Sequence, residues 1–77
     1  MAHAAENLLL RSLDLARRHE ALSWELRTAT SLAMLWRDGG RIAQAADLLG
    51  AVYGRFQEGL GTADLIRAAR LLEELGA

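Results

Sequence analysis

The sequence predicts an all-α protein of four antiparallel helices, because three of its features agree. Hydrophobic residues make up 52% of the 77 positions and aromatic residues only 5%, so alanine and leucine must form most of a core. Such a core favours close helix packing over a β-sandwich. Proline is absent, which permits long helices, and apolar residues recur every three or four positions. The predicted helices cover residues 4–18, 22–38, 42–57 and 62–75 within one domain, residues 1–77.

The first predicted helix, residues 4–18, carries more apolar surface than one neighbouring helix can cover. One face holds Ala5, Leu9, Ser12, Leu13 and Ala16, and further apolar surface comes from Leu8, Leu10 and Leu15. We place its end at residues 19–21, where the apolar stripe changes phase. A continuous helix over residues 4–38 would also be longer than a chain of this size can bury.

The central stretch, residues 22–58, predicts a helical hairpin. The apolar positions of its first helix are Leu22, Leu26, Ala29, Ala33 and Trp36, and those of its second are Ile42, Ala45, Leu49, Val52 and Phe56. Both sets step by three or four residues, which keeps each set on one side of its helix. Gly39 and Gly40 end the first helix, and a turn this short forces the two helices to lie antiparallel.

The last predicted helix, residues 62–75, follows a glycine-containing linker at residues 57–61. Thr62 suits the N-cap, and Asp64 favours the first turn. The expected buried positions are Leu65, Ala68, Ala69, Leu72 and Leu75. Charged residues occupy the other side of this helix, which is what the end of a helical array requires.

The order of small and large residues in the hairpin resembles a tetratricopeptide (TPR) repeat. That pattern places a small residue in the first helix, an aromatic residue three positions later, glycine in the turn, then alanine and a large apolar residue in the second helix. The matching positions are Ala33, Trp36, Gly40, Ala45 and Leu49, followed by Val52. Ala29 stands in place of the usual early tryptophan, and Gln57 stands where the pattern often has proline.

The resemblance implies a fragment of an α-solenoid, and an internal echo agrees with it. Residues 5–9, AENLL, return as AADLL at residues 45–49. Residues 4–19 are then the second helix of a partial repeat, residues 22–58 a full repeat and residues 62–76 a terminal helix. The sequence of residues 31–75 also resembles the last repeat of the helical arrays in large bacterial signalling proteins. Those proteins combine such arrays with adenylate/guanylate cyclase, ATPase or DNA-binding domains.

Composition disfavours several classes of protein. The chain has no cysteine, which removes disulfides and thiolate metal sites and is compatible with the cytoplasm. A net charge of −1 provides no electrostatic drive toward nucleic acid. No apolar run approaches the ~20 residues of a membrane-spanning helix. We therefore expect a cytoplasmic protein that binds neither nucleic acid nor membranes.

Candidate catalytic and metal sites are weak in this sequence. His19–Glu20 begins like a HExxH zinc motif, but Ser23 stands where the second histidine ligand belongs. The turn at residues 38–41 could bind an anion through free amides and Arg41, or it could simply close a helix. Glu73 and Glu74 diverge by about 100° on a helix and cannot act on one bond. We expect no catalytic set, no metal and no cofactor.

The expected function is a protein–protein interaction or self-assembly scaffold. The expected partner is another protein or a second copy of the chain, with Leu8, Leu10, Leu15 and Trp24 as the assembly surface. An exchange of helices at residues 19–21 is one form of such a dimer. Trp24 could equally belong to the core, because it lies beside the apolar stripe. The alternative is a regulatory segment of a cyclase or ATPase that binds a small ligand in a cavity lined by Ala29, Ala33 and Ala45.

Overall fold

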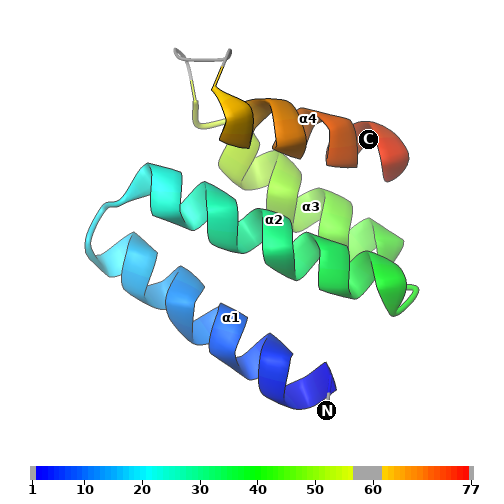
Figure 1. Cartoon of the computed structure of the whole chain (residues 1–77), viewed down its shortest axis with the longest axis horizontal. Helices are drawn as coiled ribbons and strands as arrows, with labels where there is room; N and C mark the ends of the chain where they lie inside the picture. Colours follow the sequence, from blue (N-terminus) through cyan, green and yellow to red (C-terminus); the bar gives the residue numbers. More distant parts are fainter. Residues whose placement is uncertain (1, 57–61, 77) are drawn as a thin grey trace.

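A computed structural model describes residues 2–56 and 62–76, and this part of the chain contains four α-helices and no strand. The helices are α1 (Ala2–Arg18), α2 (Leu22–Asp38), α3 (Ile42–Tyr53) and α4 (Ala63–Glu74). Figure 1 shows α2 in the middle of the molecule, with α1 on one side and α4 on the other. The predicted all-α class is therefore confirmed.

Helix α2 is the element around which the others pack. It contacts α1, α3 and α4, whereas the backbone of α1 approaches only α2. Successive helices reverse direction, so α2 and α4 run the same way, and α4 packs against both α2 and α3 (Figure 1). Helix α2 accordingly contains the largest set of buried residues: Glu25, Leu26, Thr28, Ala29, Thr30, Leu32 and Ala33.

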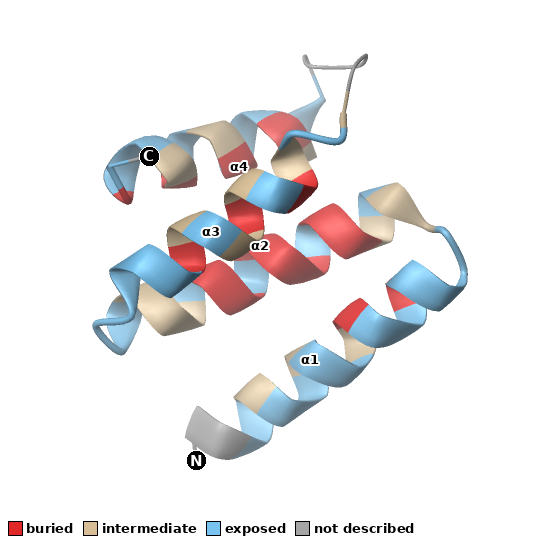
Figure 2. Ribbon diagram, turned by 180° about the vertical axis from the view of Figure 1, so that it is seen from behind, coloured by how far each residue is buried: buried red, intermediate tan, exposed pale blue. Residues whose placement is uncertain are grey.

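The core is built mainly from alanine and leucine, as the composition predicts. Its buried members are Leu13, Leu26, Ala29, Leu32, Ala33, Ala45, Leu49, Val52, Leu65, Ala68, Leu71 and Leu75. Ala29, Ala33 and Ala45 have no exposed surface, and their small side chains let α2 and α3 approach closely. The buried residues line the inner sides of the helices, and the outer side of α1 is almost entirely exposed (Figure 2).

The break between α1 and α2 lies where the change of phase predicts it. The amide of Ala21 donates to the carbonyl of Ala16 at 2.9 Å, and the amide of Glu20 donates to that of Arg17 at 3.1 Å. These two bonds form a Schellman motif, the closure that usually carries glycine at its left-handed position. Here Glu20 takes that position with φ 53°, so the sequence contains no glycine to mark this turn.

The turn between α2 and α3 has the same pair of hydrogen bonds. The amide of Arg41 donates to the carbonyl of Trp36 at 2.8 Å, and the amide of Gly40 donates to that of Arg37 at 3.0 Å. Gly40 occupies the left-handed position with φ 84°, which glycine adopts without steric cost. Helix α2 therefore ends at Asp38, as expected.

The predicted end of α3 at residue 57 is wrong, because the helix stops at Tyr53. Gly54 follows as the C-cap residue, and the amides of Arg55 and Phe56 bond in a tighter turn to Val52 and Tyr53. The apolar spacing of three or four residues continues to Phe56 and therefore predicted a longer helix. Gly54 has low helix propensity and allows the chain to leave the helix earlier. Ile42, expected on the buried stripe, is 41% exposed at the start of α3. The predicted linker at residues 57–61 lies outside the described residues.

Helix α4 begins as predicted, with Thr62 as its N-cap. The hydroxyl of Thr62 accepts from the amide of Leu65 at 3.4 Å. Leu71, which was not expected in the core, is buried, whereas Ala69 and Leu72 are only partly buried. The helix is thus rotated slightly toward the side that faces α2.

Candidate functional site

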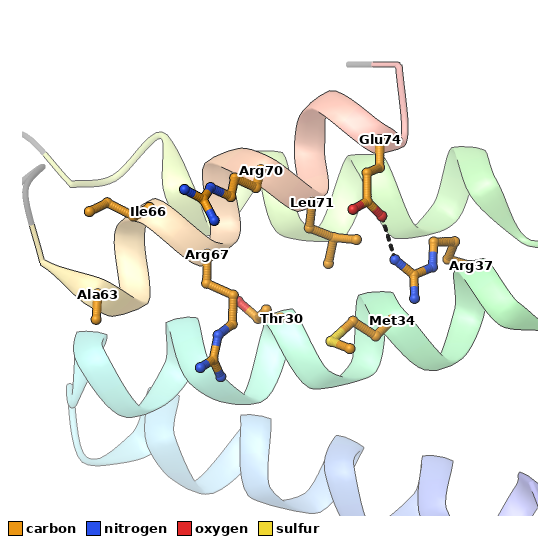
Figure 3. A pocket seen from close by; sticks show the side chains of 9 residues that line it. All are labelled: Thr30, Met34, Arg37, Ala63, Ile66, Arg67, Arg70, Leu71 and Glu74. Carbon is orange, nitrogen blue, oxygen red and sulfur yellow. Dashed lines mark hydrogen bonds and ion pairs between the residues drawn. The ribbon is translucent and has the colours of Figure 1, made fainter.

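A groove between α2 and α4 is the leading candidate site. It has a volume of about 550 Å³ and is lined by Thr30, Met34, Arg37, Ala63, Ile66, Arg67, Arg70, Leu71 and Glu74. Figure 3 shows the Met34 side chain lying along α2, and the Arg67 side chain extending from α4 to α2 beside Thr30. A smaller hollow continues the groove toward Arg27 and Asp64. This site was not predicted from the sequence, because its lining comes from two helices that are not adjacent in the chain.

Two ion pairs between α2 and α4 bound the groove. Arg27 Nε lies 3.6 Å from Asp64 Oδ2, and Arg37 Nη1 lies 2.6 Å from Glu74 Oε2. Each pair joins a residue of α2 to the residue 37 positions later, so the two helices run parallel in one register. At 1.5 Å per residue, the ten residues between the pairs correspond to about 15 Å of groove.

The groove presents both apolar and positively charged surface. Met34 is 41% exposed and Ile66 is 43% exposed. Arg67 and Arg70 are exposed and, among the described side chains, have no carboxylate within ion-pair distance. Glu74, spaced for a pair with Arg70 within α4, instead pairs with Arg37. The groove can therefore attract negative charge next to an apolar contact.

A polar seam joins α1 to α2 and includes Trp24. The indole Nε1 of Trp24 donates to Ser12 Oγ at 3.0 Å, and Ser12 Oγ lies 3.2 Å from Thr28 Oγ1. The Trp24 ring stacks on the His19 ring with 6.2 Å between centroids. The structure thus places Trp24 in the contact between two helices of its own chain and leaves it only partly exposed.

Trp36 lies in a second polar cluster near the turn at residues 38–41. Its Nε1 donates to Glu6 Oε1, which also accepts from Arg41 Nη2. The Arg41 guanidinium lies 5.1 Å from the centroid of the Trp36 ring, a cation–π arrangement. Arg41 is therefore engaged by a carboxylate and a ring, and the turn amides bond to carbonyls of α2. This arrangement supports the helix-closing interpretation of the turn over anion binding.

Glu25 is a buried charge that was not predicted from the sequence. Its side chain is only 2% exposed, and it accepts from Arg17 Nε at 3.1 Å and from Arg55 Nη1 at 2.9 and 3.0 Å. Both arginines are about half exposed, so the carboxylate is neutralised from the solvent side. The sequence signal for this burial is that Glu25 directly precedes the apolar Leu26. The partners Arg17 and Arg55 lie eight and thirty residues away, so spacing within α2 does not identify them.

The predicted assembly residues do not form one continuous apolar surface. Leu8 is 67% exposed, Leu10 41% and Leu15 44%. Leu8 and Leu15, seven residues apart, lie beside the buried face of α1 on one flank, and Leu10 lies beside it on the other flank. Between Leu8 and Leu10, a shallow depression on the outer face of α1 is lined by Asn7, Arg11 and Asp14. The exposed face is therefore mixed in character.

The residues expected to match a repeat lie mostly in the core. Ala29, Ala33, Ala45, Leu49 and Val52 are buried, Trp36 is partly buried, and Gly40 lies in the turn. The three alanines proposed to line a ligand cavity have no exposed surface. They fill the contact between α2 and α3, and the groove described above lies on a different side of α2.

In residues 2–56 and 62–76, no group of three histidine, cysteine, aspartate or glutamate side chains is placed to hold a metal ion. His19 stacks on Trp24 instead. None of the described helices has the length and apolar character needed to cross a membrane.

Comparisons with known proteins do not identify a relative. A scan against protein-family models, a search of curated proteins and a search of solved structures each found no match. The functional interpretation therefore depends on the groove, the charges around it and the arrangement of the helices.

Proposed function

We propose that this chain is a protein-interaction module whose binding face is formed by α2 and α4. The observation that carries the proposal is the groove between these helices, where Met34 and Ile66 are each more than 40% exposed beside arginines. Exposed apolar side chains in a concave site are typical of surfaces that bind a partner.

The arrangement of helices supports a TPR-like interpretation of this module. Helix α1 corresponds to the second helix of a preceding repeat, α2 and α3 to a full repeat, and α4 to the first helix after it. The register of 37 residues between α2 and α4 is close to the 34 residues of a TPR unit. In stacked helical repeats, equivalent helices line one extended concave surface, which corresponds to the α2–α4 side here.

The type of protein that contains this module is suggested by the resemblance of residues 31–75 to helical arrays of bacterial signalling proteins. We propose that it belongs to a helical array of a cytoplasmic bacterial signalling protein. In such a protein, binding of a partner to the array would be coupled to a cyclase, ATPase or DNA-binding domain elsewhere.

Selection of peptides against the purified chain tests the binding face. Random short peptides are displayed and selected on the chain, and their binding is then compared with a double variant, Met34→Ser with Ile66→Ser. Both side chains are more than 40% exposed and lie outside the core, so the variant should keep its fold while the apolar surface of the groove is removed. Leu8→Ser is the matched control, since Leu8 is an exposed apolar residue on α1.

The two outcomes of this selection are distinct. Peptides that bind the chain and the Leu8→Ser control but not the double variant support the α2–α4 face. The proposal is wrong if no peptide is enriched, or if the enriched peptides bind all three proteins equally well.

Self-association through α1 is a second candidate, favoured by the 67% exposure of Leu8. The replacement of Leu8 and Leu10 by glutamate should dissociate an oligomer that uses the outer face of α1. Light scattering on a sizing column measures this change as a fall to the monomer mass of 8.4 kDa. Ile66→Glu is the control, and an oligomer unaffected by both changes would exclude this surface.

Regulation by a small ligand is the other alternative. A volume of about 550 Å³ lies within the range of ~300–1,000 Å³ for small-molecule pockets. A thermal-shift screen detects ligand binding, because a specific ligand raises the melting temperature of the protein as its concentration increases. The Met34→Ser and Ile66→Ser double variant should lose that response.

A further inference from the structure

We propose that the groove between α2 and α4 binds an extended acidic segment of a partner protein. In this arrangement, carboxylates of the segment meet Arg67 and Arg70, and apolar side chains of the segment contact Met34 on α2 and Ile66 on α4. The inference rests on the proposed function and specifies the chemistry of the partner.

The charges around the groove favour an acidic partner. The groove and the hollow that continues it contain Arg27, Arg37, Arg67 and Arg70, against only Asp64 and Glu74. The two carboxylates are already engaged by Arg27 and Arg37. Two arginine guanidinium groups therefore remain for a ligand on a chain whose net charge is −1. Arginine binds carboxylates with two parallel hydrogen bonds, which gives geometric preference as well as attraction.

The dimensions of the groove favour a short extended segment. The two ion pairs are separated by about 15 Å along α2 and α4. An extended chain rises about 3.3 Å per residue, so roughly four or five residues fit between the pairs. Successive side chains of an extended segment point to opposite sides. Acidic and apolar residues that alternate would therefore place their carboxylates and their apolar groups on different walls.

The walls of the groove are held in place before any partner binds. The Arg27–Asp64 and Arg37–Glu74 pairs lie at the two ends of the groove, and Leu71 anchors α4 in the core at 4% exposure. Binding of a partner would therefore order the exposed side chains of the groove without having to order the backbone of its walls. Figure 3 shows Arg67 lying across the opening between the helices, in a position to contact a bound segment.

A binding experiment with defined peptides tests this proposal. The probe is a dye-labelled peptide of about five residues that alternates glutamate and leucine, with both ends capped, and fluorescence anisotropy measures its affinity. A peptide with lysine in place of glutamate should not bind. Affinity for the acidic peptide should fall as salt is added, because the charges involved are exposed.

Charge reversal of the groove arginines gives the decisive comparison. Arg67→Glu combined with Arg70→Glu should weaken binding by about ten-fold or more, since two charge-assisted contacts become repulsive. Arg11→Glu, a matched change on the outer face of α1, should leave the affinity unchanged. Circular dichroism of each variant confirms that the fold is kept, and Arg67→Lys with Arg70→Lys should retain part of the affinity because the charge remains.

Several results would overturn the proposal. Equal binding of the acidic and basic peptides would do so, as would equal affinity for the charge-reversed groove and the Arg11→Glu control. Displacement of the peptide by free glutamate at the same concentration would instead assign the groove to a small anion. If the peptide selection yields groove-dependent binders that are not acidic, the interaction module stands and only the preference for acidic segments is wrong.

Discussion

The two hairpins of this protein share α2 and the same type of turn, but they are held together by different chemistry. The α2–α3 hairpin is closed by Gly40 and packs through alanines with no exposed surface. The α1–α2 hairpin is closed by Glu20 and buries Leu13 and Ala16, but it is also joined by hydrogen bonds and ion pairs, including those of Ser12, Trp24 and Glu25. The same backbone geometry is thus compatible with an apolar interface and with a mixed apolar and polar one.

This difference bears on which hairpin contributes more to stability. Helix α3 is covered by two helices, whereas the backbone of α1 approaches α2 alone. Apolar burial contributes about 25 cal/mol per Å², while each hydrogen bond contributes only about 1 kcal/mol net. We therefore expect the α2–α3 contact to dominate stability and the α1–α2 seam to contribute mainly specific geometry.

The largest expected effect is in the apolar hairpin. Leu49→Ala removes a side chain with no exposed surface and should lower the free energy of unfolding by about 2–5 kcal/mol. Leu13→Ala should cost less, because Leu13, although buried, lies on a helix that packs against α2 alone and can shift toward the space left by the side chain. Urea denaturation measures both, with Leu8→Ala as the exposed control. A larger loss for Leu13→Ala would reverse the comparison.

The next effect concerns the buried carboxylate of the polar seam. Glu25→Gln keeps the volume of the side chain but removes the charge that Arg17 and Arg55 contact. We expect a loss of about 1.5–3 kcal/mol, as for hydrogen bonds to charged groups. The loss should shrink in high salt. Chemical denaturation at low and high salt measures it, and a loss below that of an exposed ion pair would show that the burial of Glu25 offsets its contacts.

The two turns should respond in opposite directions to changes at their left-handed residues. Gly40→Ala should destabilise the protein by about 1 kcal/mol, because alanine is strained at φ 84°. No atom would clash with the added methyl group, so the effect isolates the backbone. Glu20→Gly relieves the same strain and should stabilise by about 0.5 kcal/mol. Thermal unfolding compares them, and a loss of stability in both variants would contradict the shared motif.

The smallest expected effect is on the exposed outer face of α1. Asp14 and Arg18 form an i,i+4 pair, with 3.0 Å between Oδ2 and Nε, and both side chains are more than half exposed. Asp14→Asn should therefore change the free energy of unfolding by no more than about 0.5 kcal/mol. The same denaturation curves provide the measurement, and a change comparable with that of Glu25→Gln would mean that exposure does not separate these two ion pairs.

Prediction from the sequence worked best where a local signal exists. The start of α2 at Leu22, the Gly40 turn and the Thr62 cap follow from periodicity and from residues with strong local preferences. It failed at the end of α3, where the apolar spacing through Phe56 outweighed the glycine at position 54. Local spacing describes which side of a helix is apolar, but it does not determine where the chain leaves the helix.

The candidate site was predicted much less well than the fold. Arg67 and Arg70 were assigned to a solvated face, which is correct for each residue alone. Their significance arises only when α4 lies parallel to α2, because Glu74 then pairs with Arg37 and not with Arg70. No spacing within α4 contains that information.

The sequence by itself determined the all-α class, the number of helices and the alanine-rich contact between α2 and α3, since these depend on the spacing of residues along each helix and on the short turn that joins two of them. Only the tertiary structure decided the partners of Glu25 and the groove between α2 and α4. Those features join residues that are distant in the chain. They depend on how whole helices pack in space, and a periodic pattern within one helix carries no record of that packing.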